Sequence, residues 1–291
     1  MFIVKYRKIF VSISAFLVTL SVASIIIFGL NFGIDFKGGA LLEVTYKEGR
    51  PEQSVLVSEV NSVGLNDALI QPTGTDGYSI KTRSLTEAER NSLLSALGPL
   101  AQEKSFTSIG PSVGAELVRK SIISFILVSL GIIFFIAFSF RKVSKPVSSW
   151  KYGLIAIGTL IHDILIPVGV FVILSKTLGT EVDTLFVVAI LTILGLSVSD
   201  TIVVFDRIRE NIRIGHFKTF EETVGKSLEQ VYTRSIMTSL TVIIALLSLA
   251  IFGPSTTRTF AFMLTAGMFF GTYSSIFLAS PLLVMLNKNV K

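Results

Sequence analysis

Long apolar runs, separated by short polar segments, fill most of this chain. A helix needs about 20 residues to cross the roughly 30 Å hydrocarbon core of a bilayer. Six runs are long enough, at residues 9–30, 119–140, 153–174, 184–205, 231–252 and 260–286. The pattern therefore predicts a polytopic α-helical membrane protein with six transmembrane helices. The first run is long for a signal peptide and lacks an A-x-A-like cleavage site, so we expect it to remain as a helix.

The long polar segment between the first two runs predicts a small α+β domain. Its stretches alternate in the order βαββαβ, which is the ferredoxin-like order. They are strands at 40–46, 68–73, 78–83 and 105–109, and helices that begin near Pro51 and Thr86. Thr86, followed three residues later by Glu89, forms a capping-box pattern. The segment has no nucleophile with a base, no metal-ligand spacing and no phosphate loop, so we expect a module that binds or couples and does not catalyse.

These patterns divide the chain into three parts. Residues 1–30 hold the N-terminus and the first helix, residues 31–115 the small domain, and residues 116–291 the other five helices. Basic residues gather before helix one, between helices two and three, between four and five, and after six. The positive-inside rule then places both termini in the cytoplasm and residues 31–115 outside. The basic residues of that count are Lys5, Arg7, Lys8, Arg141, Lys142, Lys145, Lys151, Arg207, Arg209, Arg213, Lys218, Lys226, Lys288 and Lys291.

Composition supports the membrane interpretation and excludes several kinds of site. The chain is 51% hydrophobic and only 16% charged, against roughly 25% charged in an average soluble domain. It has no Cys and two His, so we expect no disulfide, no metal site and no cofactor. The net charge of +6 is explained by membrane orientation, and we expect no nucleic-acid partner. We expect a protein that is not an enzyme.

Asp200 is the first of three ionisable groups placed inside the predicted membrane helices. A charged side chain at mid-membrane costs about 2.5–3.5 kcal/mol on insertion scales, so such residues mark candidate functional sites. Asp200 lies six residues before Asp206 at the predicted inner edge, which is about 9 Å deep at 1.5 Å per residue. The preceding turn holds Gly195, Ser197 and Ser199. These small residues allow a neighbouring helix to approach, and the site suits a proton carrier. The alternative is a static ion pair or a packing hydrogen bond.

Arg234 and the pair His162–Asp163 are the other two groups. Arg234 lies at the inner start of helix five, where it either snorkels to the interface or reaches Asp200 from the adjacent helix. His162 and Asp163 interrupt helix three near mid-membrane. Successive helical positions point about 100° apart, so we expect that the two cannot both face one partner. They are a candidate proton relay, because histidine titrates near neutral pH, or else a polar pair satisfied between helices.

Two further segments have simpler interpretations. Asp35 lies where helix one meets the polar segment, and Gly38-Gly39 permit a tight turn into the first strand, so we expect an elbow there. Residues 206–230 mix charges with spaced apolar residues. This pattern predicts an amphipathic helix on the inner surface, or equally a docking surface for a cytosolic partner.

Five motifs carry a family resemblance. They are "GIDFKGG", "VGAEL", "LIHDILI", "LGLSVSDTIVVFDRIREN" and "TRSIMTSLT", in that order. The chain resembles the SecF family of bacterial protein-export membrane proteins over essentially its whole length. The long block around Asp200 is the most specific part, although "GLSVSD" departs slightly from the family's "GYSINDT"-like form. That family belongs, with SecD, to the RND superfamily of proton-driven transporters.

The resemblance implies a structure and a role. The chain would be one half of an RND-type transporter in the bacterial inner membrane, with SecD as the other half. SecYEG, YajC, the lipid bilayer and a translocating preprotein would be its further partners. With SecD it would use the proton motive force to promote preprotein translocation and release. Asp200 and Arg234 match the family's proton-pathway residues. The alternatives are half of a small-molecule or lipid exporter of the same superfamily and a structural assembly factor for the channel.

Overall fold

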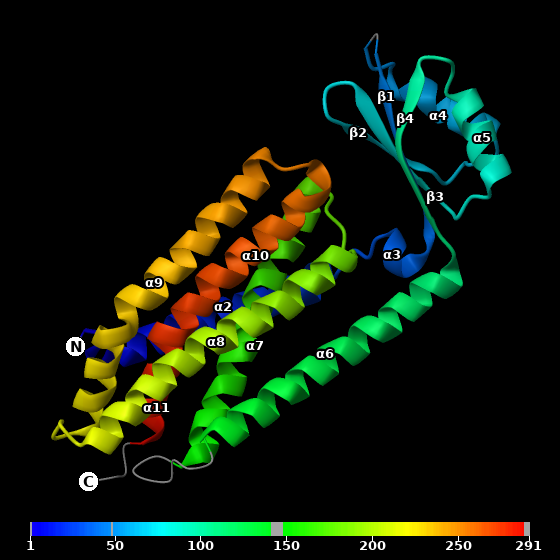
Figure 1. Cartoon of the computed structure of the whole chain (residues 1–291). Helices are drawn as coiled ribbons and strands as arrows, with labels where there is room; N and C mark the ends of the chain where they lie inside the picture. Colours follow the sequence, from blue (N-terminus) through cyan, green and yellow to red (C-terminus); the bar gives the residue numbers. More distant parts are fainter. Residues whose placement is uncertain (1, 48, 141–147, 288–291) are drawn as a thin grey trace. The chain divides into compact units, whose positions relative to one another are not determined.

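The structure is a computed structural model that describes residues 2–47, 49–140 and 148–287 (Figure 1). The chain forms two compact units. One is Phe32–Ile122, and the other joins Met1–Asn31 with Ile123–Lys291. Five basic residues that support the predicted orientation lie outside the described residues: Arg141, Lys142, Lys145, Lys288 and Lys291.

The larger unit is a helix bundle. Within the described residues, six helices are long and apolar enough to cross a membrane, which confirms the predicted number. The bundle elements are α1 (Phe2–Lys5), α2 (Arg7–Phe28), α6 (Pro111–Phe140), α7 (Ser149–Leu178), α8 (Thr184–Ile214), α9 (Phe220–Phe252), α10 (Ser255–Ser274), η1 (Ser275–Ala279) and α11 (Ser280–Leu286). The short helices α1 and α11 contact each other, so the bundle begins and finishes at the same end.

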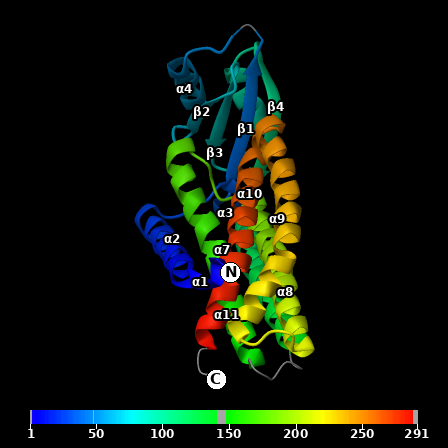
Figure 2. The same cartoon turned by 90° about the vertical axis from the view of Figure 1, so that its left-hand side faces the viewer.

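Helix α10 is central to the packing of the bundle. It contacts α7, α8 and α9, and α2 packs against α7 (Figures 1 and 2). Glycines allow two of these close approaches: a Cβ on Gly267 of α10 would lie 2.2 Å from Ile193 of α8, and one on Gly169 of α7 would lie 2.5 Å from Ser21 of α2.

Helix α6 packs differently, because its most apolar stretch has no buried residue. The bundle therefore leaves one apolar helix largely uncovered by the rest of the chain.

Helices α8 and α9 continue well past the predicted membrane segments. At 1.5 Å per residue the 31 residues of α8 extend about 46 Å, more than the hydrocarbon core requires. Only residues 215–219 separate α8 from α9. Asn211 of α8 donates to Ser227 and Gln230 of α9, each at 2.8 Å. The predicted separate surface helix over 206–230 is therefore wrong, because the two long helices pair through this region.

The last transmembrane segment contains a π-helical turn. Residues Ser275–Ala279 form η1 between α10 and α11. Pro281 follows it and has no N–H to donate to the carbonyl four residues earlier. A π turn widens the helix by one residue and is frequent at functional sites. Here it lets two successive hydroxyls, Ser274 and Ser275, make separate buried contacts.

The smaller unit is an antiparallel sheet with two helices. Its strands are β1 (Gly39–Tyr46), β2 (Leu69–Thr73), β3 (Gly77–Thr82) and β4 (Ala101–Ile109), and its longer helices are α4 (Gln53–Ser62) and α5 (Glu87–Ala96). The sheet order is β2-β3-β1-β4, with every neighbour antiparallel. Burial alternates along β1, and α4 and α5 cover the buried face (Figure 1).

Sequence patterns located most elements of the small unit. The capping box is present: Glu89 N–H donates to Thr86 Oγ1 at 3.4 Å, and Thr86 N–H donates to Glu89 Oε2 at 2.8 Å. Strand β4 begins at Ala101, four residues before the predicted 105. Its early residues are polar because β4 is an edge strand, where charged side chains are common. One of them, Glu103, pairs with Arg90 of α5 at 2.5 Å.

Candidate functional site

Asp163 is the centre of a buried polar cluster between three helices. Its side chain is fully buried and accepts three hydrogen bonds. His162 Nδ1 lies 2.8 Å from Oδ1, and Ser274 Oγ of α10 donates to Oδ2 at 2.8 Å. Ser197 Oγ of α8 also donates to Oδ2. A buried carboxylate is expected to have such partners, and these bonds tie α7 to α8 and α10.

His162 extends this cluster towards α2. His162 and Asp163 are adjacent in sequence and bond to each other. The expectation that the two cannot both face one partner stays a prediction. When the carboxylate is ionised, Nδ1 carries the proton and Nε2 is an acceptor. His162 is 2% exposed, yet Nε2 has no hydrogen-bond partner among the described residues. Its ring stacks on Tyr273 at 6.2 Å, and the Tyr273 hydroxyl donates to Phe10 O of α2 at 3.2 Å.

Asp200 faces a small cavity between α8, α9 and α10. The cavity leaves about 20 Å³ for the centres of water molecules, which is enough for about one water. Its lining includes hydroxyl side chains from all three helices and two glycines of α10; the lining residues are Leu196, Ser197, Asp200, Ser239, Gly267, Met268, Gly271 and Thr272. Oδ2 of Asp200 is buried and has no hydrogen-bond partner among the described residues. The site is polar and can hold water beside an unsatisfied carboxyl oxygen.

Glycines of α10 bring this helix against α8 at the cavity. A Cβ on Gly271 would lie 3.2 Å from Cβ of Ser197. Gly195, in contrast, has no atom near its missing side chain. The small residues predicted around Asp200 therefore act unequally, because Ser197 meets the neighbouring helix and Gly195 does not. The glycines of α10 that complete the contact were not identified in the sequence.

Arg234 does not pair with Asp200 in this structure. It is exposed on α9, and no hydrogen bond or ion pair is recorded for it with another described residue. The next residue, Ser235, is buried, and it is the side chain of this residue, not that of Arg234, that interacts with the carboxyl group of Asp200. The Asp200–Arg234 pair therefore stays a prediction.

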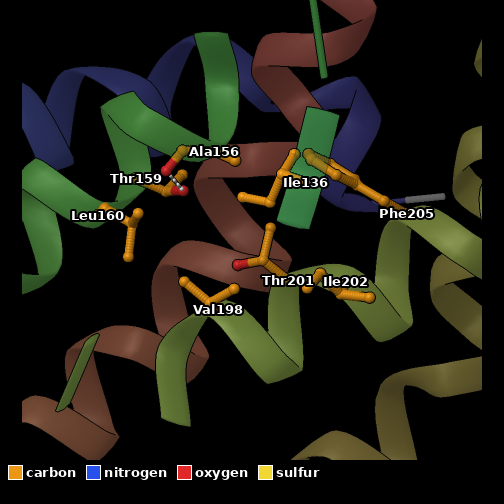
Figure 3. Close-up of a pocket in the computed structure, with 8 residues that line it drawn as sticks. All are labelled: Ile136, Ala156, Thr159, Leu160, Val198, Thr201, Ile202 and Phe205. Atoms are coloured by element: carbon orange, nitrogen blue, oxygen red, sulfur yellow. Dashed lines mark hydrogen bonds between the residues drawn. The ribbon is translucent and has the colours of Figure 1, made fainter. Parts of the chain in front are cut away.

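Next to the polar cluster the bundle is dry. Figure 3 shows apolar side chains of α6, α7 and α8 that close on one another. The hollow between them has no room for the centre of a water molecule; it is lined by Ile136, Ala156, Thr159, Leu160, Val198, Thr201, Ile202 and Phe205. Thr159 Oγ1 donates to Ala156 O within its own helix at 2.9 Å. The space for a water beside Asp200 and the lack of space here separate a polar site from a packed apolar layer.

The elbow is built from glycines that no other residue could replace without strain. Gly38 has φ +78° and Gly39 has φ +142°. A Cβ on Gly39 would lie 2.7 Å from Thr82 O of β3, and one on Gly38 would lie 3.0 Å from Cα of Pro111. Asp35 lies just before them in the short helix α3 (Ile34–Lys37). The elbow therefore sets the start of β1 against the strand end that precedes α6.

Several residues of the site could not be identified from sequence reasoning. Ser274, Tyr273, Thr272 and Ser239 are the main ones. The signal was the spacing of Gly267, Gly271 and Ser274 at four and three residues in the sixth helix, which places small residues on one face. Within the described ranges, no group of three His, Asp or Glu side chains converges in a way that could hold a metal.

Comparisons with known proteins agree with this architecture. The family model described as "Protein export membrane protein SecD/SecF, C-terminal" matches residues 90–289, and that described as "SecD/SecF GG Motif" matches residues 23–49. The protein translocase subunit SecF of Thermobaculum terrenum is 42% identical over 97% of this chain and 92% of its own length. That of Anaerolinea thermophila is 36% identical over 96% and 92%.

A solved structure of a related protein has the same fold over nearly the whole of this chain. The crystal structure of SecDF, a translocon-associated membrane protein from Thermus, matches with a TM-score of 0.83 at 29% identity. The match covers 98% of this chain and 38% of that chain, so this chain corresponds to little more than a third of the longer protein. From the family models and the curated relatives together, the chain belongs to the SecF family of protein-export membrane proteins.

Proposed function

We propose that this SecF-family chain, together with a SecD partner, uses the proton motive force to promote preprotein translocation and release through the SecYEG channel. Asp200 is the proton carrier, and Arg234 is the cation that works with it. The observation that carries this proposal is the buried, unpartnered Oδ2 of Asp200 at a cavity with room for about one water.

Physical chemistry gives this carboxyl group a role. A carboxylate inside a membrane is costly, and such residues face a bundle interior or a water-filled cavity and mark ion or proton paths. Desolvation favours the neutral form and a nearby cation favours the ionised form. A movement that brings Arg234 towards Asp200 would release the proton, and its withdrawal would allow another to bind. The exposed Arg234 of this structure corresponds to the withdrawn state.

A second half is required to complete the transporter. The most apolar stretch of α6 has no buried residue, and those of α2 and α9 are 17% buried. These faces are suited to lipid or to a second bundle, and the longer SecDF chain supports a SecD partner. SecYEG, YajC and the preprotein are the further partners.

Both termini lie in the cytoplasm, and residues 31–115 form an extracytoplasmic ferredoxin-like domain between the first two membrane helices. The element order and the antiparallel strand order β2-β3-β1-β4 support the ferredoxin-like topology.

Export in reconstituted vesicles tests this function. Asp200→Asn keeps the size of the side chain and removes its titration, so it should assemble with SecD but lose gradient-stimulated export. Arg234→Met should have the same defect, and the double variant should be no worse than either single one, since residues that act as a unit are non-additive. Asp206→Asn is the matched control, because that side chain is on the same helix but 68% exposed.

The outcomes are distinct. Wild-type export from Asp200→Asn under a proton gradient would remove the proposed role of this residue. Gradient-driven loss of a small molecule or lipid from the vesicles, without any effect on a preprotein, would instead favour the exporter. Normal export without dependence on the gradient would favour a structural assembly factor.

A further inference from the structure

The cluster around Asp163 has a second ionisable site that the proposed proton step does not use. Asp163 is fully buried and lies on α7, whereas Asp200 lies on α8. Buried polar groups in folded proteins are nearly always hydrogen-bonded, and the nature of the partners decides what else the group can do. Here two of the three donors to Asp163 are hydroxyls, which rotate and can both accept and donate a proton. The cluster therefore has the chemistry of a proton path as well as that of a clamp.

Ser197 connects the two carboxyl groups. Its hydroxyl donates to Asp163 Oδ2, and the same residue lines the cavity that Asp200 faces. It precedes Asp200 by three residues, so both lie on one face of α8. A water in the cavity would lie between the unpartnered Oδ2 of Asp200 and this hydroxyl. No other described residue both lines the cavity and bonds to Asp163 in this structure.

We propose that Asp163 is the second carboxyl group of a two-site proton path, that Ser197 transfers the proton between Asp200 and Asp163, and that Ser274 is a positioning residue that holds Asp163 in place. This inference rests on the proposed function. Protonated Asp200 gives its proton to the cavity water, the water gives a proton to Ser197 Oγ, and Ser197 gives its own proton to Asp163 Oδ2. Water and Ser197 end unchanged, and one proton has moved from α8 to α7.

His162 offers the next acceptor beyond Asp163. Nδ1 bonds to Asp163 Oδ1, and the buried Nε2 has no partner among the described residues. The buried side chain of Ser14 on α2 interacts with the hydroxyl of Tyr273, whose ring stacks on His162. A path that leaves the cluster at His162 therefore leads towards the interface of α2 with α7 and α10. The packed apolar layer between α6, α7 and α8 (Figure 3) has no room for a water molecule, so the path cannot continue in that direction through water.

A static clamp is the competing explanation, and a matched control separates the two. Thr201 and Ser275 form a buried hydroxyl pair at 2.8 Å between α8 and η1. This pair joins α8 to the last membrane segment, which are two of the three segments that meet at the Asp163 cluster, but it does not contact Asp163. Thr201→Val keeps the shape of the side chain and removes the bond. If the polar contacts serve only to hold the helices together, Thr201→Val and Ser197→Ala should have similar effects.

The experiment measures gradient-driven proton flux in vesicles that contain the full chain with its SecD partner. The variants are Ser197→Ala, Asp163→Asn, Ser274→Ala, Thr201→Val and Asp200→Asn, each checked for assembly and thermal stability. Ser197→Ala and Asp163→Asn should lower flux at least about tenfold, Ser274→Ala should lower it less, and Thr201→Val should stay within about twofold of wild type. If Asp163→Asn fails to fold, Ser197→Ala decides, because it removes only one of three donors.

Each result has one meaning. Wild-type flux in assembled Ser197→Ala, with flux lost in Asp200→Asn, would overturn the two-site path and leave the proposed function intact. Equal losses in Ser197→Ala and Thr201→Val would also overturn it, because the cluster would then be a clamp. Wild-type flux in Asp200→Asn would instead refute the proposed function itself.

Discussion

Replacing Gly39 with alanine should destabilise the small unit strongly, for two reasons that can be separated. The φ angle of +142° at Gly39 is one that residues with a side chain rarely adopt, at a cost of about 1–3 kcal/mol. The new Cβ would also lie 2.7 Å from Thr82 O. That carbonyl belongs to the β1–β3 ladder and cannot move without weakening it. Overpacking of this kind costs about 1–3 kcal/mol more.

Gly64→Ala is the matched control for the conformational cost. Gly64 has φ +80° and belongs to the same unit, but nothing lies within 4 Å of its missing Cβ. Its substitution should cost only about 1–2 kcal/mol. The two variants therefore differ by the clash, which is about 1–3 kcal/mol. Since 1.4 kcal/mol is about tenfold in an equilibrium, the difference corresponds to roughly 5- to 150-fold.

Hydrogen–deuterium exchange of the β1 and β3 amides in the full chain measures this difference, because the protection of core amides reports the free energy of unfolding. Gly39→Ala should lose roughly 5- to 150-fold more protection than Gly64→Ala. Equal losses would refute the argument that the close approach to Thr82 requires glycine at the elbow.

Three other substitutions test whether stability rises or falls in the predicted direction. The hydrogen bond from Arg83, with further ones from Thr86, lowers the pKa of Glu89 to about 2. The contribution of Glu89 to stability is therefore present above about pH 4.5 and is lost as pH falls towards 2. Glu89→Gln should make the melting temperature depend less on pH over that range, and an unchanged pH dependence would contradict this reasoning. In helix α7, Gly169→Ala should lower the melting temperature because its Cβ would meet Ser21 at 2.5 Å. Gly158→Ala, with nothing within 4 Å, should raise stability slightly through helix propensity. A rise in melting temperature for both variants would show that α2 and α7 do not pack closely.

Local patterns predicted the elements of the fold because their causes are local. Six apolar runs became six candidate membrane helices, and Thr86 with Glu89 formed a capping box. The pattern failed where neighbours decide the outcome. Residues 206–230 have an amphipathic sequence that suits a membrane surface, but Asn211 finds partners on α9, so the two helices pair there.

The site was only partly predictable for the same reason. The cost of a charge in a membrane identifies Asp200 and Asp163 from sequence alone. It does not identify Ser274, whose hydroxyl bonds to Asp163 across 111 residues of sequence. The π turn at Ser275–Ala279 is equally hidden, since it follows from how Pro281 is accommodated within a packed helix. Arg234 shows the converse, because proximity in sequence to α8 does not bring it to Asp200 in this structure.

The most direct test of the proton-carrier role is to observe the protonation of Asp200 itself. Infrared difference spectra of the chain in vesicles with its SecD partner would record the carbonyl stretch of protonated carboxyl groups when a proton gradient is imposed. A band that changes with the gradient in wild type and in Asp206→Asn, and is missing in Asp200→Asn, is the predicted result. A gradient-dependent band that is unchanged in assembled Asp200→Asn would contradict the account, because the proton would then be carried by another group.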